Sequence, residues 1–150
     1  MDDARSRPDF TGVWAVNFEK STMRGQAPDE ILMKIEHREP SVVQQMHVTY
    51  GNGHKARLTF AYKTTGEETS HSISGGIGKS RAHWEGTELV IESSMKTADR
   101  EFHFRDYWSI SSDGRTLTMA HRNDDLDGQI SVLEKAPQAD KEFDKANHSN

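Results

Sequence analysis

The sequence contains no cysteine, and this absence excludes several kinds of site at once. A chain without cysteine forms no disulfide, holds no thiolate-bound metal and has no cysteine nucleophile. It also has no apolar run that approaches the ~20 residues of a membrane-spanning helix. We therefore predict no transmembrane segment.

Positive charge is also in deficit. The 150 residues include 19 Lys and Arg against 24 Asp and Glu, so that the net charge is −5. Because nucleic-acid affinity depends on a basic surface, this balance argues against nucleic acid as a partner. Lys55, Arg57 and Lys63 form a basic stripe on one expected strand, which we interpret as a solvated face. The sequence gives no prediction of the oligomeric state.

No segment within the main part of the chain is patterned as a helix; alternation of apolar and polar residues predicts ten strands instead. Gly51-Asn52-Gly53 and Ser112-Asp113-Gly114 are typical hairpin turns. Gly75-Gly76-Ile77-Gly78 interrupts the alternation, and we expect a flexible hairpin there. The first strand lies within 9–21, and the others are 30–39, 42–50, 55–63, 68–74, 79–85, 88–96, 101–110, 116–123 and 129–135.

Ten strands joined by short turns predict an all-β, up-and-down antiparallel meander. Closing such a sheet into a barrel removes its exposed edges, and about ten strands leave room for an interior cavity. An open sandwich of two five-stranded sheets is the alternative. We assign residues 9–136 to the barrel and 137–150 to a polar C-terminal tail, which is either a frayed helix or disordered.

The first strand organises the expected fold. Phe10, Gly12, Trp14, Val16 and Phe18 share one face of it. A glycine two residues before a tryptophan lets the backbone pass close to a neighbouring strand, while the indole fills the base of the core. We therefore expect Trp14 to be buried at the closed end, and the first and last strands to pair.

The segment Phe10-Thr11-Gly12-Val13-Trp14 resembles the Gly-x-Trp strand of the lipocalins and related calycins. Other segments extend this likeness to an uncharacterised bacterial family of lipocalin-like barrels. These segments are Asn17, Glu19-Lys20-Ser21, Ile35-Glu36-His37, Trp84-Glu85-Gly86, Leu89-Val90-Ile91-Glu92-Ser93 and Trp108-Ser109-Ile110-Ser111-Ser112-Asp113-Gly114-Arg115-Thr116-Leu117-Thr118.

The resemblance covers roughly residues 9–135 and implies a closed lipocalin-like barrel. It brings no catalytic residues with it. In lipocalins a basic residue covers the tryptophan, and Arg122 is its counterpart here by position. Many members of the family are exported, which favours a periplasmic or secreted location over a cytoplasmic one, although residues 1–7 lack the apolar core of a leader.

The histidines are numerous, at eight in the chain, and strand phase separates them. His47, His83 and His103 are expected to face solvent, and His37, His71 and His121 to face inward. Imidazole binds metals and haem. No strand carries two histidines at metal-site spacing, so we predict no metal and no cofactor. We expect the histidines to be hydrogen-bonded or solvated. Haem binding by the three inward histidines is the alternative.

Asp106 interrupts an otherwise apolar face of its strand, between Phe104 and Trp108. A buried carboxylate is costly unless it is paired or protonated. It could bind the polar group of a ligand or act as a general base. The alternatives are a local bulge that turns it outward, or a structural ion pair with Arg122.

Inward positions combine apolar side chains with a few polar ones, as small-molecule pockets do. A filled core with tyrosine tips that reach water has the same composition. The apolar positions are Met33, Met46, Phe60, Phe102 and Met119. The candidate ligand-binding residues are His37, Gln44, Tyr50, Tyr62, Phe104, Asp106 and His121.

Three functions follow from these observations. The first is a barrel that binds a small hydrophobic or amphipathic molecule. The second is an enzyme that uses Asp106 with an inward histidine, and the third is a filled interaction module without a ligand. A cavity above ~300 Å³ favours the first two, and Asp106 within hydrogen-bond reach of a histidine on its wall favours the second.

Overall fold

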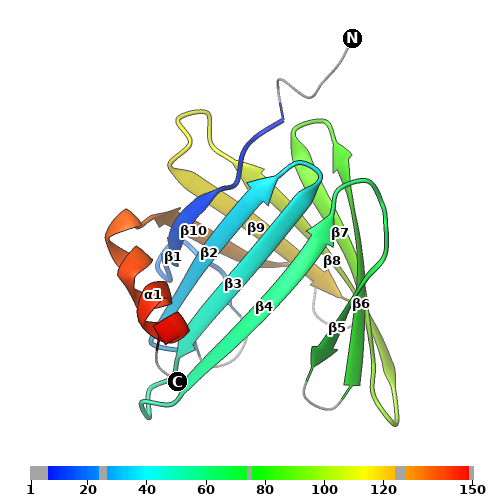
Figure 1. Ribbon diagram of the computed structural model, residues 1–150, viewed down its shortest axis with the longest axis horizontal. Helices are drawn as coiled ribbons and strands as arrows, with labels where there is room; N and C mark the ends of the chain where they lie inside the picture. Colours follow the sequence, from blue (N-terminus) through cyan, green and yellow to red (C-terminus); the bar gives the residue numbers. More distant parts are fainter. Residues whose placement is uncertain (1–6, 24–26, 74–75, 124–127, 149–150) are drawn as a thin grey trace.

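The structure is a computed structural model that describes residues 7–23, 27–73, 76–123 and 128–148. Within these ranges ten antiparallel strands form one sheet, which a C-terminal helix follows (Figure 1). The predicted all-β meander is confirmed. The strands are β1 (Gly12–Val16), β2 (Glu30–Arg38), β3 (Ser41–Thr49), β4 (Lys55–Lys63), β5 (Thr69–Ile73), β6 (Gly76–Glu85), β7 (Glu88–Lys96), β8 (Glu101–Ile110), β9 (Thr116–Asn123) and β10 (Gln129–Lys135).

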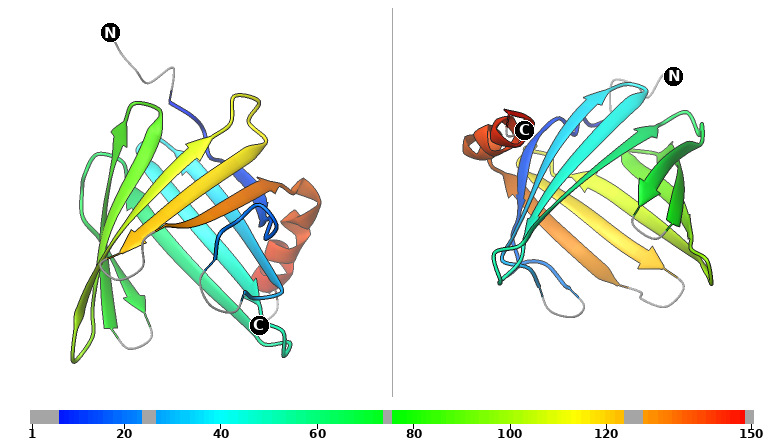
Figure 2. Two further views of the ribbon diagram at one scale, coloured as in Figure 1. Left: turned by 180° about the vertical axis from the view of Figure 1, so that it is seen from behind. Right: turned by 60° about the horizontal axis from the view of Figure 1, so that its bottom comes forward.

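The sheet curls into a nearly closed, calycin-like barrel (Figures 1 and 2). Its strand order is β4-β3-β2-β1-β10-β9-β8-β7-β6-β5, so strands that follow one another in the chain pair, except β4 and β5, and β1 also pairs with β10. This confirms the expected pairing of the first and last strands and excludes the sandwich. The two edges of the sheet are β4 and β5, and no backbone ladder joins them within the described residues.

Aromatic side chains pack one end of the barrel, which we call the closed end. Phe10 and Trp14 are fully buried there. The ring of Phe10 stacks on Trp84 at 5.9 Å and meets Trp108 edge-on at 5.6 Å. The indole N–H of Trp14 donates to the carbonyl oxygen of Phe10 at 3.0 Å. Gly12 has φ +151°, a conformation that side chains disfavour, so glycine permits this entry into the core.

Lys135, and not Arg122, supplies the cation over Trp14. Its Nζ atom lies 4.9 Å from the ring centroid of Trp14 and donates to the carbonyl oxygen of Thr11 at 3.2 Å. Trp14 and Lys135 are direct partners in the β1–β10 ladder, so their side chains lie on the same side of the sheet. The prediction for Arg122 is wrong because Arg122 is exposed, with its guanidinium 5.8 Å from the ring of Tyr107.

The glycine-rich segment lies in the hairpin of β5 and β6, and Gly76, Ile77 and Gly78 belong to its second strand. β6 begins at Gly76, and Gly78 pairs with His71 on one side and Met95 on the other. A Cβ atom on Gly76 would clash with the backbone oxygen of Lys96. Glycine therefore allows two backbones to approach closely here, which fits the strand pairing. Gly75 lies outside the described residues.

The C-terminal segment forms a short 3-10 helix, η2 (Pro137–Ala139), and an α-helix, α1 (Asp140–His148). Helix α1 lies on the outside of the barrel (Figure 2). Phe143 is its anchor, with 1% of its surface exposed, and it packs with Val13 and Leu32 on the outer face of β1 and β2. The ring of His47 stacks on Phe143 at 4.2 Å. Within the described ranges, no helix has the length and apolar character to cross a bilayer.

We predict that Phe143→Ala lowers the free energy of unfolding by about 3 kcal/mol, because it empties the contact between the helix and the barrel. Urea unfolding followed by tryptophan fluorescence measures this loss. Lys141→Ala, an exposed position of the same helix, is the matched control and should change stability by less than ~0.5 kcal/mol. Equal midpoints for the two variants would show that the helix does not dock.

Candidate functional site

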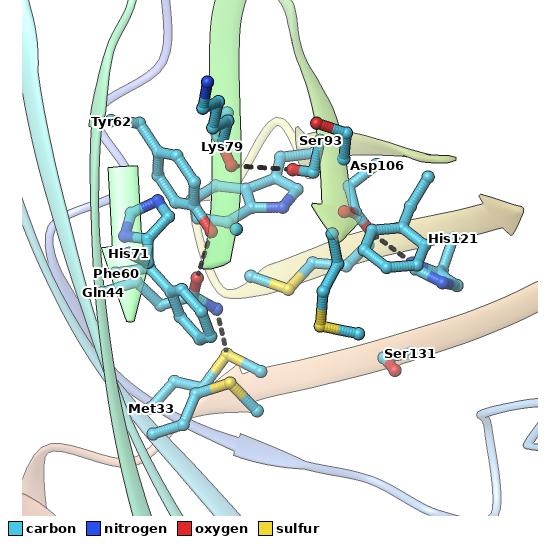
Figure 3. A pocket seen from close by; sticks show the side chains of 18 of the residues that line it. Met33, Gln44, Phe60, Tyr62, His71, Lys79, Ser93, Asp106, His121 and Ser131 are labelled. Carbon is cyan, nitrogen blue, oxygen red and sulfur yellow. Dashed lines mark hydrogen bonds and ion pairs between the residues drawn. The ribbon is translucent and has the colours of Figure 1, made fainter. Parts of the chain in front are cut away.

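A cavity of about 410 Å³ lies inside the barrel, beside the closed end (Figure 3). Strands from both halves of the sheet contribute to its wall, because alternate residues of each strand point inward. Most of the lining is apolar and flexible, with several methionines. The apolar side chains are Met33, Met46, Phe60, Met95, Phe104, Trp108 and Met119.

One polar group on the wall is the pair of Gln44 and Tyr62. The hydroxyl of Tyr62 donates to Oε1 of Gln44 at 3.2 Å, and Nε2 of Gln44 donates to the sulfur of Met33 at 3.3 Å (Figure 3). Burial raises the pKa of Tyr62 far above its usual value, and the nearby carboxylate of Asp106 raises it further. Tyr62 therefore remains a neutral hydroxyl, and its proton is engaged by Gln44.

The second polar group is Asp106 with His121. The two residues are direct partners in the β8–β9 ladder, and Oδ1 of Asp106 lies 2.7 Å from Nδ1 of His121. The carboxylate accepts, so Nδ1 carries the proton and Nε2 is available to a ligand. The hydrogen bond to Asp106 raises the pKa of His121, although burial opposes the shift. Asp106 thus faces inward and pairs with His121 rather than with Arg122.

His71 is the third polar group, and its Nε2 atom is buried without a hydrogen-bond partner among the described residues. Its ring meets Phe60 and Tyr62 edge-on, with centroids 5.3 and 5.8 Å apart. Desolvation lowers the pKa of His71, which keeps the imidazole neutral. A buried polar atom without a partner is rare in folded proteins. His71 therefore marks a position where a ligand can complete a hydrogen bond.

Small polar residues on other strands were not in the predicted set. Ser80 and Ser93 form a hydrogen bond of 2.8 Å across β6 and β7, and Gln129 and Ser131 of β10 line the same cavity. Ser80 alternates with Gly78 and Ala82, so its inward phase was available from the sequence. The apolar pattern that identifies an inner face does not reveal these positions, because small polar residues interrupt it.

Five of the predicted ligand-binding residues line the cavity: Gln44, Tyr62, Phe104, Asp106 and His121. Their alternation along β3, β4, β8 and β9 placed them on the inner face. Their role in binding remains a prediction.

His37 and Tyr50 do not line the cavity, which corrects the prediction of their position. His37 lies at the closed end, where its Nδ1 accepts from the backbone N–H of Phe10 at 3.2 Å and its Nε2 lies 2.7 Å from Oε1 of Glu39. It has the inward phase, but it belongs to the packed part of the core. Tyr50 follows the last residue of β3, so strand alternation no longer directs it, and 42% of its surface is exposed.

The described histidines lie apart from one another. Within the part of the chain that the structure describes, no group of three or more His, Asp or Glu side chains is arranged to hold a metal ion. His71 and His121 face the cavity as phase predicts, whereas His47 lies under α1 on the outside. The site therefore offers hydrogen bonds, one carboxylate and apolar surface.

Neither a scan against protein-family models nor a search of the curated proteins gives a match. Solved structures do resemble the fold. Secretory abundant heat soluble protein 4 from Ramazzottius varieornatus has a TM-score of 0.59 at 15% identity, over 85% of this chain and 95% of that one. A second secretory abundant heat soluble protein from the same organism has a TM-score of 0.57 at 14% identity, over 86% of this chain and 97% of that one.

The fatty-acid-binding protein of Manduca sexta is a more distant likeness. Its TM-score is 0.47 at 16% identity, over 85% of this chain and all of that one. At these identities the likenesses are to the fold. The two secretory abundant heat soluble proteins, with TM-scores above 0.5, share the overall fold of this chain.

We predict that Asp106→Asn lowers the pKa of His121, because the neutral amide no longer stabilises the imidazolium. An NMR titration of the histidine ring protons measures the change. His47, whose pKa burial lowers from outside the barrel, is the internal control and should titrate as in the wild type. An unchanged His121 titration would contradict the hydrogen bond.

The same pair makes stability depend on pH. Because folding raises the pKa of His121, the pair stabilises the fold fully below the unfolded value of about 6.5. This contribution is lost as the pH rises through the raised pKa of the folded state. Asp106→Asn should remove this part of the pH dependence.

Proposed function

We propose that this barrel binds a small hydrophobic or amphipathic molecule in its interior cavity. The observation that carries the proposal is a cavity of about 410 Å³ with apolar walls and three convergent polar groups. Its volume is above the ~300 Å³ at which small-molecule sites begin. A filled interaction module would not need an interior of this volume.

The composition of the wall supports the same function. Methionines from β2, β3, β7 and β9 contribute much of the apolar surface. Their unbranched side chains adapt to ligands of different shape. Phe10 and Trp14 are fully buried at the closed end and do not line the cavity. The apolar interior is thus divided between a packed part that supports the fold and an adaptable part suited to a ligand.

An enzyme on the same barrel is the second candidate. The specific observation in its favour is the 2.7 Å hydrogen bond between Asp106 and His121 at the cavity wall. A carboxylate that orients an imidazole produces a general base.

Native mass spectrometry of gently purified protein, followed by analysis of its organic extract, identifies a bound molecule. Incubation of that molecule with fresh protein distinguishes release of the same compound from its conversion.

We predict that Ser131→Phe weakens binding of the uncharged dye Nile red at least tenfold. Ser131 is on the cavity wall, so a phenyl ring at this position occupies the space of the ligand (Figure 3). A fluorescence titration measures the affinity. Ile130→Phe is the matched control, because Ile130 is the adjacent, exposed residue of β10 and is absent from the cavity lining.

The control should bind the dye within about twofold of the wild type, since the outer face does not contact the cavity. Equal affinities for Ser131→Phe and the wild type would place the dye on the surface. That result would contradict an interior binding site.

A further inference from the structure

We propose that the cavity selects an amphipathic amine, with a positively charged head and an apolar tail, over the matching carboxylate. The inference rests on the proposed binding function and specifies its ligand class. It follows from the charges on the cavity wall and from the hydrogen-bonding capacity that remains there.

The cavity lining contains one carboxylate and no guanidinium among the described residues. Its ionisable side chains are Asp106, His71, His121, Tyr62 and Lys79. Lys79 lies between the inward-facing Gly78 and Ser80, is exposed, and points its amine away from Asp106 and His121 (Figure 3). It therefore adds no cation to the space beside this pair.

The charge of Asp106 and His121 together is zero or negative. With a protonated imidazole the pair is neutral, and with a neutral imidazole it carries the charge of Asp106. Tyr62 and His71 remain uncharged, for the reasons given above. An anionic head group of a ligand therefore has no uncompensated cation beside the pair to bind, whereas an ammonium head group can bind the carboxylate of Asp106. Opposite charges attract more strongly at a partly buried site such as this one than in bulk water.

Hydrogen bonding leads to the same preference. A carboxylate head needs donors, but the Tyr62 hydroxyl already donates to Gln44, and one N–H of the Gln44 amide to Met33. The donors that remain on the wall include uncharged hydroxyl and amide groups, such as those of Ser131 and Gln129. An ammonium head has three donors and needs acceptors. A carboxylate has about four acceptor positions, so the single bond between Asp106 and His121 leaves capacity for an ammonium. The buried Nε2 of His71 is a further acceptor in its neutral, Nδ1-protonated form.

Displacement of bound Nile red by dodecylamine, dodecanol and dodecanoate tests the inference. The three compounds share one tail and differ in the charge of the head. At pH 8 in 150 mM salt, and below the concentrations at which they form micelles, the amine and the carboxylate are both ionised. We expect dodecylamine to displace the dye at a concentration at least tenfold lower than dodecanoate, with dodecanol between them.

Two substitutions separate the cavity from the surface, which also attracts amines because the net charge is −5. Asp106→Asn should reduce the ratio of amine to carboxylate affinity to within about threefold of unity, since it removes the interior charge. Glu101→Gln removes one charge from the exposed start of the same strand and should leave the ratio unchanged. Retained dye binding shows that each variant is folded.

A third substitution, His121→Gln, removes the imidazole whose protonation neutralises the carboxylate, and should raise the ratio. Dodecanoate binding as tightly as dodecylamine would overturn the inference, and so would an unchanged ratio in Asp106→Asn or an equal fall in Glu101→Gln. Binding of the dye with the wrong order of heads overturns only the ligand class. A wild-type protein that binds neither the dye nor any of the three compounds overturns the binding function, and the inference with it.

Discussion

The pairing of β1 with β10 is the constraint on which the rest of the structure depends. It joins residues more than a hundred positions apart, as in the partners Trp14 and Lys135. Closing so long a segment of chain costs conformational entropy, which long-range contacts must offset. The closed end offsets it by burying Phe10, Trp14 and Trp108 in one cluster. Only with this closure do β8 and β9 face β3 and β4 across a shared interior.

The same closure explains why an interior cavity is compatible with a stable barrel. Phe143 adds a second, smaller cluster on the outer face of β1 and β2, next to the closed end. Both clusters therefore reinforce the strands around the closure. The edges β4 and β5 lie at the two ends of the sheet order, and residues of both line the cavity. The cavity wall thus includes the two strands that, among the described residues, have a ladder on one side only.

Strand alternation made most of the fold predictable, because a period of two specifies both the strand and the face of each residue. It placed Asp106 and His121 inward, and the hairpin Ser112-Asp113-Gly114 between their strands helps to place them opposite one another. Alternation does not specify which residue reaches a given ring at the end of a barrel. Lys135 reaches the ring of Trp14 because the two residues are direct partners in the β1–β10 ladder. Arg122 follows the inward His121, so strand alternation turns its side chain outward, away from Trp14.

Two other features of the structure could not be predicted from the sequence pattern, each for a physical reason. Helix α1 is mostly charged, so its buried anchor, Phe143, gives no periodic apolar signal, and its docking depends on the outward Val13 and Leu32. The position of an inward residue along the barrel axis is also undetermined by phase. His37 and Tyr62 both have the inward phase, but His37 lies in the packed closed end and Tyr62 lies on the cavity wall.

Stability alone gives little reason for a pair such as Asp106 and His121 on an interior face of the barrel. A partly buried ion pair returns little net free energy, because desolvation of the charges offsets their attraction, and apolar partners of similar size would pack an interior face as well. His121 holds the carboxylate in place through one oxygen, which preorganises the remaining acceptor positions toward the cavity. An ammonium head that binds there competes with the imidazolium for one negative charge. Amine binding and protonation of His121 are therefore opposed, and the carboxylate is the group that couples them.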